Sequence, residues 1–279
     1  MPLELSTKNL QRYREAVDPG NATEIDMNNI QLLLLLSSIT EPAMLLLLAK
    51  RTCPIRPLGA VNVRNRFELL RTDGKPSPLL ESKDALVTAS LHSRPRLVKR
   101  GLEHDIETTL SMPDSKSGEQ IPVFRQVFTM LQFMKIQNPE VAPKPKNKEL
   151  FSSAVKLPVE IQSHEPSNWA AICKDYNPIH ISSLVARAYG FPGKIAHGNH
   201  VVAKAIHALT SRSHESAHLL GKMYMPLWME VEFKRPVTVP NQLELRITQN
   251  DDENTMAEFE LSIGEKVSVE GTLGVLKKQ

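Results

Sequence analysis

Residues 174–200 bring an acid and a histidine close together: Asp175 and His180 are five residues apart, with Asn177 and Pro178 between them. In a continuous helix, residues five apart point about 140° away from each other. Pro178 disfavours helical backbone at Asn177, so the chain must turn there, with Asn177 as cap and Pro178 as the first residue of the next helix. A carboxylate and an imidazole that meet across such a turn can share one water molecule and transfer protons near neutral pH.

The dipeptide His197-Gly198 closes the same stretch, immediately before an apolar run over 199–209 that is typical of a buried helix. Backbone N–H groups in the first turn of a helix lack intrahelical partners, and a glycine lets an oxygen atom approach them closely. Gly198 is therefore a candidate for stabilising an oxyanion, whereas we predict that His197 is a structural hydrogen-bonding residue. Such a site suits a thioester carbonyl that becomes enolate-like during a reaction.

A second motif offers a different chemistry. His214, Glu215 and His218 form His-Glu-x-x-His, which on a helix could bind zinc and make the protein a metallopeptidase. Polar residues precede this motif, and Tyr224 occupies the position of a third ligand. The sequence therefore favours a polar loop over 211–221 and no metal site.

The elements that would position these residues fall into two halves, 1–136 and 151–279, on either side of a linker rich in proline and lysine, 137–150. Each half has apolar residues at helical spacing, followed by alternating apolar residues that predict antiparallel strands. The expected helices are 41–51 in the first half and 180–189 and 199–209 in the second; the expected strands are 59–71, 84–94, 97–112 and 121–133, then 229–236, 242–248, 257–263 and 266–271. This order of elements predicts a duplicated α+β domain.

The leucine-rich segment 30–49 has nearly the length of a membrane span. Gln31, Glu41 and Pro42 interrupt it, so we predict two short buried segments, with a helix that restarts at Glu41 or Pro42, and no membrane span.

Composition narrows the class of protein further. A formal charge of +3 without a concentrated basic stripe argues against a nucleic-acid partner, although the run "RPRLVKR" (94–100) could hold a phosphate.

Cys53 and Cys173 lie far apart, which argues against a disulfide framework. Cys173 is close to Asp175, but a buried free cysteine is favoured over a catalytic thiol. The N-terminus lacks the pattern of a secretory signal, so we expect a cytoplasmic protein, with a mitochondrial or peroxisomal site left open.

The spacing of the motif residues resembles one family. "DYNPIH" (175–180), followed by Ala186, Gly190 and Phe191 and then by "KIAHG" (194–198), looks like the motif of MaoC-like, type-2 (R-specific) enoyl-CoA hydratases and dehydratases. The strand "VEFKRPV", the linker and the degenerate first half resemble the double-hotdog members of that family. The resemblance implies a double hotdog, in which two antiparallel sheets each wrap a central helix. The central helices would be those after Gly198 and after Glu41.

The resemblance also implies a reaction and a role for each residue. Asp175 and His180 would hold the water that adds across the double bond of a trans-2-enoyl thioester, with His180 as base and Asp175 as its acid partner. The Gly198 N–H would bind the thioester carbonyl, and Asn177 would fix the loop. The substrate would be an acyl-CoA or an acyl carrier protein thioester, the product an (R)-3-hydroxyacyl thioester, and no cofactor is implied.

Other implications concern binding and assembly. Lys234 and Arg235 could meet the phosphates of coenzyme A, or could equally be a solvated strand end. The first half would make room for the acyl tail, bordered by leucines such as Leu46 and Leu47. The sequence departs from the family at Ser182, where an acid is common, which puts substrate range in doubt. A hotdog that binds thioesters without converting them is an alternative function, and a monomeric pseudo-dimer or a homodimer would fit the fold.

Overall fold

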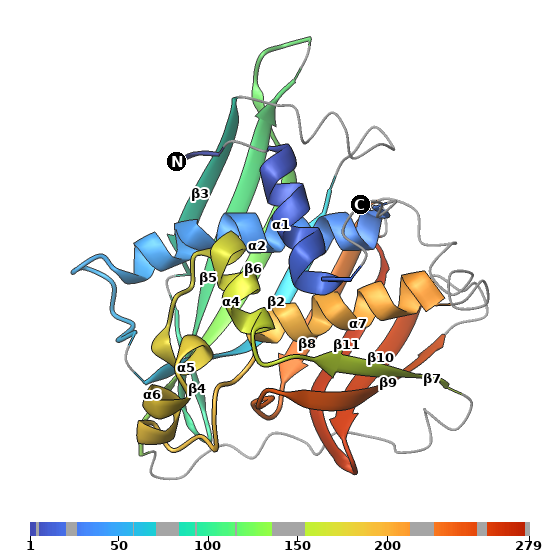
Figure 1. The fold of residues 1–279 in the computed structure, drawn as a ribbon. Coiled ribbons are helices and arrows are strands. Elements are labelled where there is room, and N and C mark those ends of the chain that lie inside the picture. The colour runs from blue at the N-terminus through green and yellow to red at the C-terminus, as the bar shows by residue number, and fades with distance from the viewer. Residues whose placement is uncertain are drawn as a thin grey trace.

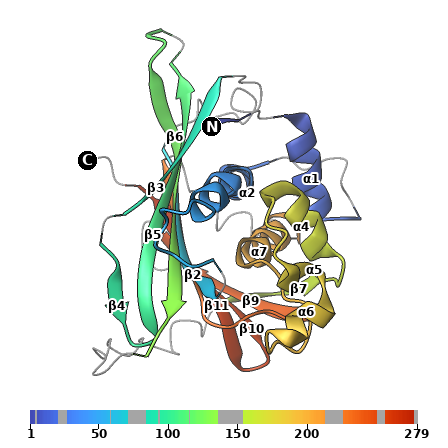
Figure 2. The same cartoon turned by 90° about the vertical axis from the view of Figure 1, so that its left-hand side faces the viewer.

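One continuous antiparallel sheet forms a layer of the molecule, and helices cover one of its faces (Figures 1 and 2). This computed structural model describes residues 1–3, 6–20, 27–57, 59–70, 84–92, 94–114, 116–135, 154–212, 226–249 and 256–276. The strand order is β1 (Pro2–Leu3), β3 (Ala85–Leu91), β5 (Gly101–Pro113), β6 (Gln120–Phe133), β2 (Ala60–Leu69), β8 (Leu227–Phe233), β11 (Lys266–Val275), β10 (Met256–Ile263), β9 (Asn241–Gln249) and β7 (Val155–Ile161). A short strand, β4 (Arg96–Val98), pairs with β5.

The two halves of the chain meet edge to edge in this sheet. Strand β2 of the first half pairs antiparallel with β8 of the second, from Arg64 opposite Glu232 to Leu69 opposite Leu227. The central helices α2 (Asn29–Leu48) and α7 (Gly198–Arg212) lie against the two halves of the sheet (Figure 2). The predicted double hotdog is therefore confirmed, with its two sheets joined into one.

The helix of the first half differs from the prediction. Segment 30–49 is not broken at Glu41 or Pro42, because α2 runs without interruption through both. Gln31, read as an interruption, completes a capping box instead: the Asn28 side chain accepts from the Ile30 and Gln31 N–H groups, and the Gln31 side chain accepts from the Asn28 N–H. A proline removes only one intrahelical hydrogen bond at its own position, and the buried leucines around it favour a continuous helix.

The burial of α2 bears on two expectations, one about a membrane span and one about Leu46 and Leu47. By length and composition it could cross a membrane, but most of the span packs inside the protein as the central helix of the first half. The expectation that Leu46 borders buried space is wrong, because Leu46 is 58% exposed. Leu47 packs at the edge of an apolar cluster around Met44 and Leu48.

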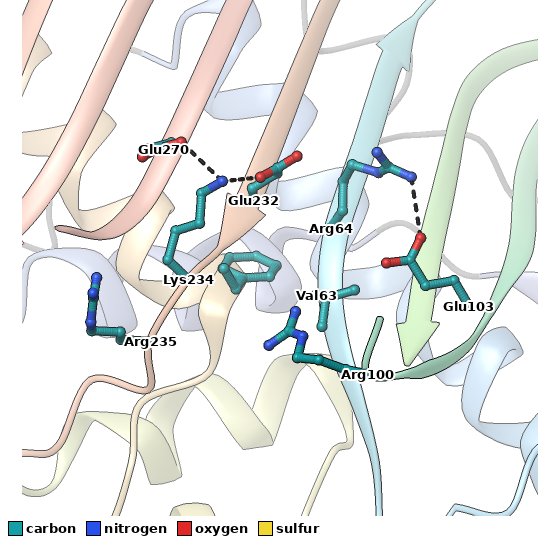
Figure 3. Close-up of a pocket in the computed structure, with 9 residues that line it drawn as sticks. Val63, Arg64, Arg100, Glu103, Glu232, Lys234, Arg235 and Glu270 are labelled. Atoms are coloured by element: carbon teal, nitrogen blue, oxygen red, sulfur yellow. Dashed lines mark hydrogen bonds and ion pairs between the residues drawn. The ribbon is translucent and has the colours of Figure 1, made fainter. Parts of the chain in front are cut away.

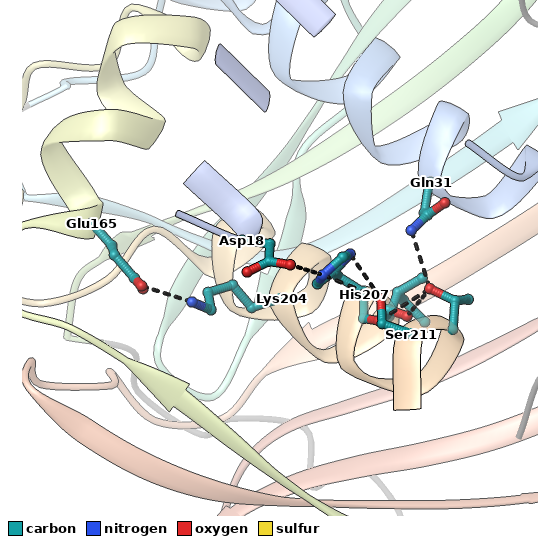
Figure 4. Close-up of polar contacts among 8 residues, drawn as sticks. Asp18, Gln31, Glu165, Lys204, His207 and Ser211 are labelled. Atoms are coloured by element: carbon teal, nitrogen blue, oxygen red, sulfur yellow. Dashed lines mark hydrogen bonds and ion pairs between the residues drawn. The ribbon is translucent and has the colours of Figure 1, made fainter. Parts of the chain in front are cut away.

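Four elements had no counterpart in the sequence prediction: strands β1 and β7 and helices α1 (Thr7–Val17) and α4 (Glu165–Cys173). Both helices lie outside the α2/α7 layer (Figure 2). Polar contacts bind them and α2 to α7 (Figure 4): His207 to Asp18 at 3.2 Å, Lys204 to Glu165 at 2.7 Å, and Gln31 to Thr210 at 3.1 Å. The central helix α7 thus makes polar contacts with α2 and α4 and with Asp18 at the end of α1.

The helix predicted over 180–189 is two short helices, α5 (Pro178–Ile181) and α6 (Ser183–Ala188). Ser182 ends the first and caps the second by accepting from the Val185 N–H. Leu184, one of the apolar residues whose helical spacing predicted the helix over 180–189, is 79% exposed. The predicted linker 137–150 lies outside the described residues, so the domain boundaries remain a prediction.

Candidate active site

The loop between α4 and α5 carries the predicted acid. Lys174 ends α4 in a left-handed conformation, with φ 61°, and turns the chain toward Asp175. The Asn177 N–H donates to the Asp175 side chain at 3.1 Å. Asn177 also caps α5, whose first residue is Pro178. The loop therefore has the acid, the cap and the proline in the order that the sequence pattern predicts.

The structure brings His180 to Asp175 across this turn. His180 Nε2 lies 3.8 Å from Asp175 Oδ2, and His180 Nδ1 lies 2.8 Å from the Ile195 carbonyl oxygen. Since a carbonyl can only accept, Nδ1 carries the proton, and Nε2 presents its lone pair toward the carboxylate. Burial lowers the pKa of His180 below its ordinary 6.5. The pair thus contains a neutral imidazole ready to accept a proton, at a separation that lets both groups contact one water oxygen.

His197 contacts both residues of the Asp175–His180 pair. Its ring stacks on that of His180, with centroids 3.7 Å apart. Its Nε2 donates to the backbone carbonyl of Asp175 at 3.0 Å. Burial, and next the charge that His180 could carry, hold the pKa of His197 well below 6.5. The neutral His197 ring thus packs on His180 and hydrogen-bonds to the backbone of Asp175. This is the structural role that the sequence predicts for it.

Asp175, His180 and His197 are also the group of side chains most suited to a metal ion among the described residues, because one ligand atom from each lies within 4.8 Å of the others. The hydrogen bonds oppose such use. The His197 nitrogen that faces Asp175 already carries the proton it donates, and the lone pair is on Nδ1, which is buried and has no hydrogen-bond partner among the described residues. The cluster thus offers two ligand atoms rather than three, too few for a protein zinc site. The rival motif at His214 and His218 lies outside the described residues.

Gly198 is the first residue of α7. A Cβ atom there would lie 2.5 Å from the ring of Phe233 on β8, so only glycine fits without displacing that ring. The next residue, Asn199, donates to Ser37 of α2 at 3.1 Å and accepts from Asn65 of β2 at 2.7 Å. Both contacts come from the first half, which thus fixes the start of the helix at which Gly198 stands.

Two further buried groups affect this site. From sequence, Cys173 was weighed as a catalytic thiol, and Glu41 was read only as an interruption of the leucine-rich segment. Cys173 is fully buried, and burial, with the nearby Glu41 carboxyl, raises the pKa of its thiol well above 9.0, so it is not a reactive thiolate. Glu41 of α2 is 8% exposed, and its pKa is raised well above 4.5, first by burial and then by the charge of Asp175. The sequence feature that could have indicated a buried carboxyl group is the single acid, Glu41, within a run of leucines.

Glu41 gives the protein a testable pH dependence. Above pH 4.5 the unfolded chain releases this proton while the folded chain keeps it, so the free energy of unfolding falls as pH rises toward the raised pKa. Glu41→Gln cannot ionise, and we expect it to be more stable than the wild type near neutral pH and equally stable below about pH 4. Urea unfolding at several pH values measures the difference. A variant that is less stable at every pH would mean that the carboxyl group makes a hydrogen bond that glutamine cannot replace.

A cavity of about 440 Å³ lies beside Phe233, at the seam between β2 and β8 (Figure 3). Lys234 lines it but pairs with Glu232 and with Glu270, so it is not a free cation. Arg235 donates to the Val267 carbonyl oxygen and, among the described residues, has no acidic partner. Arg100 lines the same cavity and also lacks an acidic partner there. Arg100 belongs to the basic run 94–100, so the cavity brings together Arg100 and Arg235, which are 135 residues apart in sequence.

Comparison with known proteins agrees with this geometry. Residues 146–270 match the model of the MaoC like domain. The 3-hydroxyacyl-thioester dehydratase X of Mycobacterium tuberculosis is 25% identical over 215 residues, which are 77% of this chain and 68% of that protein.

Solved structures show the same fold over nearly the whole chain. HtdX from Mycobacterium tuberculosis has a TM-score of 0.69 at 20% identity, covering 99% of this chain and 98% of that one. A MaoC-like dehydratase from Phytophthora capsici has a TM-score of 0.65 at 16% identity, covering 98% and 94%. Residues 146–270 are thus similar to the MaoC like domain, within a chain that has the double-hotdog fold.

Proposed function

We propose that the chain is a hydro-lyase that reversibly hydrates trans-2-enoyl thioesters to (R)-3-hydroxyacyl thioesters. The MaoC-like domain and the similarity to a 3-hydroxyacyl-thioester dehydratase support a hydro-lyase that acts on acyl thioesters. The observation that carries the proposal is the neutral His180, whose free Nε2 faces Asp175 at 3.8 Å beside the helix that begins at Gly198.

In this mechanism His180 Nε2 takes a proton from a water molecule held between the two side chains as the water oxygen bonds to C3 of the substrate. The electron pair of the C2–C3 double bond moves toward the thioester carbonyl, whose developing negative charge the Gly198 N–H stabilises. The proton on His180 then passes to the Asp175 carboxylate and from there to C2, to which the electron pair returns as the C–H bond forms. One water is added overall, and the reverse sequence removes it.

The carrier is coenzyme A or an acyl carrier protein. The cavity beside Phe233 supports a phosphate-bearing carrier, because Arg100 and Arg235 are the two cations in its lining that no acidic side chain of the described residues neutralises. Guanidinium groups suit phosphate oxygens through paired N–H donors.

Hydration of crotonyl-CoA by purified protein, followed as loss of the enoyl chromophore and compared with one long-chain enoyl-CoA, tests the function. The product should be oxidised by an (R)-specific but not by an (S)-specific 3-hydroxyacyl-CoA dehydrogenase. Thioester binding without turnover of any chain length would instead favour the alternative of a non-catalytic hotdog.

We also predict that the reaction needs no metal, because the tautomer of His197 leaves the Asp175 cluster with two ligand atoms. Activity should be unchanged after dialysis against a chelator. Stoichiometric zinc in the purified protein, or activity lost with chelator and restored by zinc, would favour the peptidase-type motif at His214 or a metal at the dyad.

A further inference from the structure

A stripe of buried polar side chains crosses the inner face of the sheet in the first half. Asn65 on β2, Gln126 on β6 and Thr108 on β5 are each fully buried. Thr108 lies directly opposite Gln126, and Gln126 lies opposite Phe67, two residues from Asn65 on the same face of β2. β2, β6 and β5 are consecutive in the sheet, so the stripe spans two strand spacings, about 9–10 Å.

The stripe interrupts the hydrophobic core of this half. Along β5, Thr108 lies between Ile106 and Leu110, which belong to different apolar clusters; along β6, Gln126 lies likewise between Phe128 and Phe124. The helix passes from one cluster to the other between Ala43 and Met44. A central layer of a core would normally be filled by apolar residues, so the polar residues here need a separate reason.

Four polar atoms of the stripe lack hydrogen-bond partners within the described protein: Asn65 Oδ1, both amide atoms of Gln126 and Thr108 Oγ1. Buried polar groups are nearly always paired, and an unpaired one destabilises the fold. Neighbouring side chains that share this deficit indicate a ligand with hydrogen-bonding groups, since apolar residues of similar shape would otherwise fill the layer at lower free energy.

The stripe also connects to the candidate active site. Asn65 donates to Asn199, the residue after Gly198, at 2.7 Å. Asn65 therefore links the stripe to the residue that follows the N–H proposed to bind the thioester carbonyl. The four unpaired atoms belong to amide and hydroxyl groups that carry no charge, which fits a neutral oxygen substituent better than a carboxylate or an amine.

We propose that Asn65, Gln126 and Thr108 form a subsite for a hydroxyl or oxo group on the acyl chain of the substrate. The inference rests on the proposed function, because it takes the first half to be the site of the acyl chain. The subsite makes the enzyme selective for oxygen-substituted chains over plain ones of equal length.

The test compares trans-2-decenoyl-CoA with hydroxylated analogues of the same length, using the ratio of their kcat/KM values. The wild type should favour at least one hydroxylated chain by on the order of tenfold, the scale of one or two net hydrogen bonds. Thr108→Val and Gln126→Met, which keep shape and remove the polar atoms, should abolish that preference or reverse it. Thr109→Val is the matched control, because Thr109 is the next residue of β5 on the opposite face and should leave the ratio unchanged.

Thermal unfolding gives an independent readout without substrate. If the stripe is unpaired in the free protein, Thr108→Val and Gln126→Met should each raise Tm, by about 2–4 °C for a chain of this size.

A wild type that is active on crotonyl-CoA but shows the same kcat/KM ratio as both variants would overturn the subsite and leave the proposed hydratase function in place. Lower Tm values in the variants would overturn it too, because the polar atoms would then be satisfied by bound water in the free protein. A wild type inactive on every enoyl-CoA would overturn the proposed function itself.

Discussion

Asp175→Asn and His180→Ala should each lower kcat for enoyl-CoA hydration by on the order of a hundredfold or more, the usual scale of general acid–base catalysis. Asparagine keeps the shape of the acid but cannot exchange the proton, and alanine removes the Nε2 lone pair that faces Asp175. Both variants should fold, because the turn is set by the Asn177 cap and Pro178 rather than by either catalytic group. Stopped-flow or steady-state assays, with circular dichroism as a check on folding, measure the effect.

The double variant discriminates a pair from two independent groups. If both side chains act on one water, Asp175→Asn combined with His180→Ala should lose little more than the worse single variant, because residues that act as a unit are strongly non-additive. His92→Ala serves as the control, since His92 is a histidine of the first half with a half-exposed side chain. Folded single variants that keep near-normal rates would show that the Asp–His loop does not transfer protons, and the chain would then be at most a thioester-binding hotdog.

The candidate site was easier to predict than the helices around it, for physical reasons. The acid, cap, proline and histidine lie within six residues, and a proline restricts the backbone of its neighbour whatever surrounds it. The structure accordingly places Asn177, Pro178 and His180 where local rules put them. Short-range constraints of this kind need no knowledge of the rest of the fold.

The leucine-rich helix shows where such local rules fail. Glu41 and Pro42 are unfavourable within an isolated helix, and the sequence alone therefore predicts a break. In the folded protein α2 is buried on nearly all sides, and tertiary packing outweighs the missing hydrogen bond. The electrostatic effect of Asp175 on Glu41 could not be recognised from sequence either, because it joins residues from different halves of the chain.

Helices α1 and α4 were missed because their identity depends on partners far away in sequence. His200 donates to the Ala16 carbonyl and stacks on Trp169, and burial lowers its pKa to about 3. Burial therefore keeps the imidazole neutral while it makes this contact. Helix α4 has no pronounced apolar stripe to indicate a buried partner from sequence, and in α1 the buried residues are only Tyr13, Ala16 and Val17.

Gly198→Ala tests the other half of the mechanism and should also reduce kcat by on the order of a hundredfold, the scale seen when one oxyanion donor is lost. The new Cβ would lie 2.5 Å from the Phe233 ring, closer than carbon atoms approach. Either the ring or the first turn of α7 must move. In the second case the N–H that is proposed to meet the thioester carbonyl moves with it.

A second substitution separates these two outcomes. Phe233→Leu shortens the side chain that the Cβ would strike, so Gly198→Ala combined with Phe233→Leu should recover much of the lost rate, while Phe233→Leu alone should have a small effect. Recovery would show that glycine is needed for the position of the helix start against β8. If Gly198→Ala keeps the wild-type rate, the Phe233 ring moves rather than the first turn of α7, and the predicted displacement of the Gly198 N–H is wrong. If the double variant stays as slow as Gly198→Ala, the added methyl group acts on the substrate directly, since the first half still anchors the helix through Asn65 and Ser37 on Asn199.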